Sequence, residues 1–133
     1  MKLWLGLALA VAIGFGLAAG GTARAEEEVL EVTLEDLTLA YQDNKLAGDQ
    51  QYQGRKVRFT GYIDTIDQRR SGEPYILFWS RGGGDSRAAY CYFSAEDIPE
   101  LIKLKKGQKQ TLTCTVKGSE FGRSVNLEQC ALN

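Results

Sequence analysis

The chain has 133 residues, a formal net charge of -1, and 25% charged residues. This length fits one modest domain, and the slight acidity argues against a general affinity for nucleic acid, which usually requires a basic surface. There is no histidine, which removes the commonest general base and most zinc sites. We therefore expect a protein that is not an enzyme and has no metal or cofactor.

The first 25 residues are typical of a secretory signal peptide. Lys2 precedes an uncharged apolar run, and Ala23-Arg24-Ala25 has the small residues of a cleavage site. An uncleaved membrane anchor is the less favoured alternative, because the run is shorter than the roughly 20 residues that span a bilayer. We predict cleavage after Ala25, no stable membrane anchor afterwards, and a periplasmic or secreted location. Residues 26–32 then form an acidic, flexible N-terminus.

Residues 33–47 have the pattern of an amphipathic helix. Thr33 is suited to be its N-cap, and Gly48 is predicted to end it. The apolar stripe consists of Leu34, Leu37 and Tyr41. Because this stripe is narrow, we expect the helix to lie on the surface of a core built elsewhere.

From residue 55 the period changes to two, which predicts five strands. A short helix separates the third strand from the fourth, with a capping box at Asp97-Ile98-Pro99-Glu100. Its buried face is predicted to be Ile98, Leu101 and Ile102. The predicted strands are Arg55–Thr65, Tyr75–Ser80, Ala88–Phe93, Lys109–Lys117 and Val125–Leu132.

Five strands with a helix between the third and the fourth follow the order of an OB-fold, a small Greek-key barrel. A sandwich or an SH3-like barrel is the alternative, and the position of the helix favours the OB-fold. We predict a mainly β domain over residues 33–133. It is a five-stranded Greek-key OB-fold barrel with an N-terminal amphipathic helix and a short helix between strands 3 and 4.

Several short motifs occur here in the order found in one known family. They are Tyr41-x-x-Asn44, Gln50-x-Tyr52-x-Gly54, Gly61-x-Ile63, Cys91-x-Phe93, Leu104-Lys105-Lys106-Gly107-Gln108 and Leu127-x-x-Cys130. With these the chain resembles the tRNA_anti-like (anticodon-binding-domain-like) OB-fold family from Leu34 to Leu132. The resemblance implies a small exported or lipid-anchored bacterial protein, and it leaves the activity open. Cys114 departs from the pattern, which has a small or apolar strand residue there.

The three cysteines allow one disulfide and leave one thiol in an oxidising compartment. In an OB barrel the third and fifth strands are neighbours, and Cys91 and Cys130 both occupy core-facing positions. We predict a Cys91–Cys130 disulfide, with Cys114–Cys130 as the alternative. The remaining thiol is expected to be a buried small hydrophobic residue, and a redox-active or intermolecular thiol is the alternative.

Alternation along the second and third strands predicts an aromatic surface outside the barrel. If Ile76, Phe78 and Phe93 fill the interior, four rings lie together on the outside, where OB-folds usually bind ligands. These predicted ligand-binding rings are Tyr75, Trp79, Tyr90 and Tyr92. Loop residues rim them: Arg69, Arg70, Arg81, Arg87, Phe121 and Arg123. Alternatively, the N-terminal helix covers this face, or a register shift of one residue sends the rings into the core.

We expect an exported, non-enzymatic OB-fold binding module for a carbohydrate, peptide or protein ligand. Single-stranded nucleic-acid binding through the same face is the alternative, which the net acidity and the exported location disfavour. A second alternative is a structural or interaction protein whose aromatic face is an internal or dimer interface. The Gly82-Gly83-Gly84-Asp85 loop joins two strands and is no phosphate cradle. Asp64 and Asp67 are too few ligands for a metal.

Overall fold

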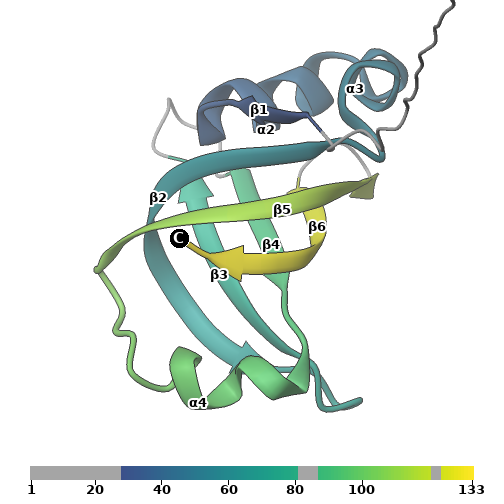
Figure 1. The fold of residues 1–133 in the computed structure, drawn as a ribbon. Coiled ribbons are helices and arrows are strands. Elements are labelled where there is room, and N and C mark those ends of the chain that lie inside the picture. Colours follow the sequence, from purple (N-terminus) through teal and green to yellow (C-terminus); the bar gives the residue numbers. More distant parts are fainter. Residues whose placement is uncertain (1–27, 81–86, 121–123) are drawn as a thin grey trace, which may run out of the picture.

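The computed structural model describes residues 28–80, 87–120 and 124–133. Within them, five strands close a barrel, so the predicted OB-fold architecture is confirmed (Figure 1). The strands are β2 (Lys56–Gln68), β3 (Pro74–Ser80), β4 (Arg87–Tyr92), β5 (Lys109–Glu120) and β6 (Ser124–Leu132). They pair in the order β2-β3-β4-β6-β5, and β5 pairs back with β2. β4 and β6 run parallel, and the other barrel neighbours run antiparallel.

The long strand β2 makes this closure possible because it serves two partners. Its residues Lys56–Tyr62 pair with β5, and its residues Ile63–Gln68 pair with β3. The register shifts between Ile63 and Thr65, and a bulge of this kind bends a strand and increases its twist. The strand therefore continues to Gln68, beyond the predicted end at Thr65.

The predicted phase of β3 and β4 is confirmed. Ile76 and Phe78 are fully buried, and Phe93 is 3% exposed. The ring of Phe78 packs edge-on against that of Phe59, with 5.5 Å between the centroids. Since these side chains fill the interior, the alternate residues of both strands point outward, and the one-residue register shift does not occur.

The N-terminal end of the described chain is a strand, and the prediction of a flexible terminus over residues 26–32 is wrong for its last part. β1 (Val29–Glu31) pairs in parallel with Lys56–Arg58 of β2. β3 pairs with β2 only from Ile63 onward, and an open strand edge has backbone groups that need partners. β1 supplies such partners, and Arg58 reinforces the pairing through an ion pair with Glu31 at 2.6 Å.

The predicted signal peptide and its cleavage site lie outside the described residues. Among the helices of residues 28–80, 87–120 and 124–133, none has the length and apolar character that crossing a membrane requires.

Two helices, rather than the single predicted helix over residues 33–47, lie over one end of the barrel (Figure 1). They are α2 (Leu34–Asp43) and α3 (Lys45–Tyr52). Thr33 caps α2 as predicted, since its hydroxyl accepts a hydrogen bond from the backbone N–H of Asp36 at 3.0 Å. The break is at Asn44, whose extended backbone ends α2 and whose side chain accepts from the N–H of Ala47 to begin α3. The predicted apolar stripe of α2 joins the barrel core: Leu34, Leu37 and Tyr41.

Gly48 is a helix interior position, so its predicted role as a helix end is wrong. A Cβ atom at this position would lie 2.8 Å from a ring carbon of Tyr41, closer than van der Waals contact allows. The glycine thus allows α3 to pack directly on the Tyr41 ring. Close approach, rather than helix termination, explains this glycine.

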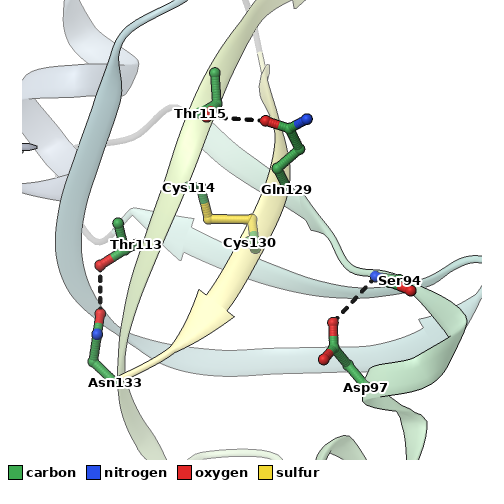
Figure 2. Close-up of a disulfide and its surroundings, with 8 residues drawn as sticks. All are labelled: Ser94, Asp97, Thr113, Cys114, Thr115, Gln129, Cys130 and Asn133. Atoms are coloured by element: carbon green, nitrogen blue, oxygen red, sulfur yellow. Dashed lines mark hydrogen bonds between the residues drawn. A yellow bond between two sulfur atoms is a disulfide. The ribbon is translucent and has the colours of Figure 1, made fainter. Parts of the chain in front are cut away.

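The opposite end of the barrel is covered by α4 (Ile98–Leu101), which follows the 3₁₀ turn η2 (Ala95–Asp97) (Figure 1). The capping box begins three residues earlier than predicted, because Ser94 caps the turn and its N–H donates to Asp97 (Figure 2). Leu101 is buried as predicted. Ile102 is 74% exposed, so its predicted place in the buried face is wrong.

The disulfide joins Cys114 of β5 to Cys130 of β6, and the predicted Cys91–Cys130 pairing is wrong (Figure 2). Two residues of β6, Gln129 and Cys130, lie between the pairs that β6 makes with Thr113 and Thr115. Gln129 has a positive φ of 54°, which is typical of a bulge, and the bulge sets Cys130 opposite Cys114 with 4.1 Å between the Cα atoms. Cys91 is a buried free thiol, as expected of the leftover cysteine. Burial raises the pKa of this thiol well above its ordinary value.

The disulfide assignment predicts how reductant changes stability. Since the disulfide closes a sequence separation of 16 residues, reduction should lower the free energy of unfolding by about 3 kcal/mol. Urea titrations with and without dithiothreitol measure this difference. Cys91→Ala should retain the difference and Cys130→Ala should lose it. Loss of the reductant effect in Cys91→Ala would contradict the pairing.

The contact of Gly48 with Tyr41 predicts a destabilising Gly48→Ala substitution, although alanine is the better helix former. The added methyl group overpacks the Tyr41 ring, so the free energy of unfolding should fall by about 1–3 kcal/mol. Gln51→Ala, at an exposed position of the same helix, is the matched control and should stay within about 0.5 kcal/mol of the wild type. A more stable Gly48→Ala protein would show that the ring moves aside freely.

Candidate functional site

Three tyrosines form a cluster on the outer surface of β3 and β4, which we call the tyrosine cluster. Tyr75 pairs across the strands with Tyr92, and Tyr90 lies two residues away on the same face. The ring centroids of Tyr75 lie 5.9 Å from Tyr90 and 5.7 Å from Tyr92, and the rings of Tyr90 and Tyr92 are nearly parallel at 6.5 Å. All three side chains are partly exposed. Helix α2 therefore does not bury these three predicted rings.

Arg69, in the turn between β2 and β3, lies against this cluster. Its guanidinium carbon is 3.9 Å from the centroid of the Tyr92 ring, within the range of a cation–π contact. The same side chain pairs with Glu73 at 3.3 Å. The contact with Tyr92 raises the pKa of the Arg69 guanidinium above its ordinary value, so this side chain stays charged. Arg70 is exposed in the same turn.

A cleft of about 430 Å³ adjoins the cluster, and we call it the tyrosine cleft. Its size is within the range of ligand pockets in proteins. Tyr90 and Tyr92 form its aromatic wall. Its polar lining comes from the C-cap of α3, the end of β5 and the start of β6: Gln53, Ser119, Ser124 and Asn126.

The charges of the tyrosine cleft differ in sign from those of the whole chain. Lys45, Arg69 and Lys117 line it together with one acid, Glu120, whereas the chain as a whole carries -1. Lys45 is held by an ion pair with Asp49 at 3.1 Å. Among the residues that the structure describes, the cleft thus combines three cations, two of them ion-paired with neighbouring acids, with aromatic walls.

Helix α3 positions one side of this cleft. Gln53, the C-cap of this helix, donates from Nε2 to the carbonyl of Lys117 at 3.0 Å, which ties the end of the helix to β5. Gly118 has a φ of +142°, and a Cβ atom there would lie 3.5 Å from side-chain atoms of both Asp49 and Gln53. Beneath Asp49 is the Tyr41 hydroxyl, whose pKa is raised first by burial and then by that carboxylate. The helix is therefore fixed against both the core and the edge of the cleft.

Trp79, the fourth predicted ring, does not join this arrangement. Trp79 lies opposite Ala88 at the far end of β3 from Tyr75, and it is 40% exposed beside a separate groove. The single face of four rings is therefore divided into two parts. Arg87 belongs to β4, and Arg81, Phe121 and Arg123 lie outside the described residues.

Sequence reasoning missed several residues of the cleft. Lys45 lies inside the predicted helix but off its apolar stripe, and Gln53 lies beyond the predicted end at Ala47, directly after α3. Lys117 is the last residue of the predicted fourth strand, and Ser119 lies beyond that predicted end because β5 continues to Glu120. Asn126 could have been found, since it alternates with the buried Val125 and Leu127 and must face outward.

Comparison with known proteins identifies the family and the fold. The tRNA_anti-like family model matches residues 18–131. A solved structure named "putative nucleic acid-binding lipoprotein", from Klebsiella pneumoniae, aligns with 80% of this chain and 92% of its own, at 15% identity and a TM-score of 0.62. A "putative aspartyl-tRNA synthetase" from Leishmania major aligns over 86% of this chain and 22% of its own, at 12% identity and a TM-score of 0.51. A sequence comparison with curated proteins gave no match.

Proposed function

The chain belongs to the tRNA_anti-like family, and from this premise we propose that it is an exported OB-fold module that binds single-stranded nucleic acid in the tyrosine cleft. The observation that carries the proposal is the meeting of the Tyr90 and Tyr92 rings with three cations in one cleft. Its location, periplasmic or secreted, is part of the proposal and rests on the pattern of the first 25 residues.

The chemistry of the tyrosine cleft matches both parts of a nucleotide. Bases stack on aromatic side chains, and each stacked base contributes about 1–3 kcal/mol to binding. Phosphates gain from cations because binding releases counterions. A neutral sugar or peptide could use the rings but would gain little from Lys45, Arg69 and Lys117. The nucleic-acid alternative is therefore favoured over the carbohydrate, peptide or protein ligand expected from the sequence.

The overall acidity of the protein does not oppose this proposal. Charges on a protein surface are screened over about 8 Å at physiological ionic strength, so acids far from the cleft contribute little to its potential. Glu35 and Asp36, for example, lie in the first turn of α2 and do not line the cleft. A strand bound there would meet the three cations that line the cleft, of which Lys45 and Arg69 are shared with Asp49 and Glu73 and Lys117 is the third. The name of the similar Klebsiella lipoprotein agrees with this proposal.

Removing one ring tests the stacking. Tyr92→Ala should weaken binding of a fluorescein-labelled dT12 oligonucleotide by about 5- to 150-fold in an anisotropy titration. Tyr92→Phe keeps the ring and should bind almost as the wild type does. A heparin oligosaccharide offers charge without bases and should be insensitive to Tyr92→Ala. Absence of wild-type binding to dT12 at physiological salt would refute the proposed function.

Removing one cation tests the phosphate contacts. For single strands, the logarithm of affinity falls with the logarithm of salt concentration by about 0.7 per neutralised phosphate. Lys117→Gln should therefore reduce this slope by about 0.7, whereas Tyr92→Ala should leave it unchanged. The matched control is Lys106→Gln, an exposed lysine outside the cleft. Equal slopes for Lys117→Gln and the wild type would exclude Lys117 from the phosphate path.

A further inference from the structure

A second aromatic groove lies beside the N-terminal end of α2, and we call it the tryptophan groove. Trp79 and Tyr62 form its walls, with 40% and 49% of their surfaces exposed. Ile63 pairs with Phe78 across β2 and β3, which makes Tyr62 and Trp79 neighbours on the outer face. The groove encloses about 310 Å³, at the lower end of the size range of ligand pockets.

Gly61 of β2 forms part of the lining of this groove. A Cβ atom there would point into the core, 2.9 Å from the Phe78 ring and 3.5 Å from Leu34. Backbone therefore lines the groove at this point. Trp79 and Tyr62 both keep part of their ring surface exposed beside this groove.

The charges beside the groove favour a base over a phosphate. Among the residues that the structure describes, one acid, Glu35, and one cation, Lys109, line it, and these two charges balance. The tyrosine cleft, in contrast, has three cations and one acid. The neutral base of a nucleotide therefore suits the tryptophan groove, and its charged phosphate suits the tyrosine cleft.

The tyrosine cluster, which adjoins the tyrosine cleft, and the tryptophan groove both include a residue on the outer face of β3. Tyr75 and Trp79 are four residues apart on the same side of β3, a distance of about 13 Å at ~3.3 Å per residue. Leu77 lies between them and is 9% exposed. Stacked nucleotides advance about 3.4 Å each along one strand, so a ligand of a few nucleotides can reach from one site to the other.

We infer that the tryptophan groove is a second base-stacking subsite, occupied by a nucleotide of the same single strand that the tyrosine cleft holds. This inference rests on the proposed function. The ligand is accordingly an oligonucleotide long enough to span both sites. A dinucleotide can occupy one of them only.

Binding of oligothymidylates of increasing length tests the inference. Affinities of dT2, dT4 and dT8 are measured by NMR titration for the wild type, Trp79→Ala and Trp79→Phe. Trp79→Ala should bind dT2 as the wild type does, with the dinucleotide held in the tyrosine cleft, and should bind dT8 about 5- to 150-fold more weakly. Trp79→Phe should restore most of the loss. Tyr62→Ala removes the other wall and should show the same dependence on length.

The outcomes separate the two claims. If the wild type binds no oligothymidylate, the proposed function fails, and the second subsite with it. If the wild type binds dT8 and Trp79→Ala binds it equally well, the second subsite is refuted while the proposed function stands. An equal loss for dT2 and dT8 also refutes it, because Trp79 would then act on the first site or on the fold. Thermal unfolding of Trp79→Ala shows whether the fold is retained.

Discussion

β2 pairs with β5 through its first half and with β3 through its second, and the bulge between Ile63 and Thr65 lets one strand serve both partners. The bulge bends β2, and closure of the barrel uses this bend because β5 pairs with the first half of the strand and β3 with the second. Closure in turn fixes which side of each strand faces inward. With Ile76 and Phe78 inside, Tyr75 must face outward, and the surface chemistry of the protein follows from the filling of its core.

The parts of this structure that sequence could predict are those in which one face of an element is buried. Alternation along β3 and β4 predicts the buried Ile76 and Phe78 because a register error would expose both of them. The spacing of Leu34, Leu37 and Tyr41 predicts the buried face of α2 for the same reason. The five-strand order and the position of α4 then follow from turn residues, and the family resemblance covers the same range.

The parts that sequence could not predict depend on local backbone irregularities. The bulge at Gln129 decides which cysteine faces Cys130, and glutamine is not a residue that signals a positive φ. Asn44 both ends α2 and caps α3, so the helix that the sequence predicts as continuous is divided at this residue. Lys45, the first residue after this break, lines the cleft, and its position there therefore could not be predicted from the sequence. Alternation shows that Tyr75 and Trp79 face the same side of β3, but it does not show that they are too far apart to form one site.

Two of the cleft's cations are already held in place without a ligand. Lys45 is paired with Asp49, and Arg69 is held by Glu73 and the Tyr92 ring. Partly exposed pairs of this kind contribute only about 0–1 kcal/mol, so a phosphate can compete for the same donors. Holding the side chains nonetheless reduces the conformational entropy that binding would otherwise remove. Because Asp49 also adjoins the buried Tyr41, this orientation is fixed by the same packing that closes the end of the barrel.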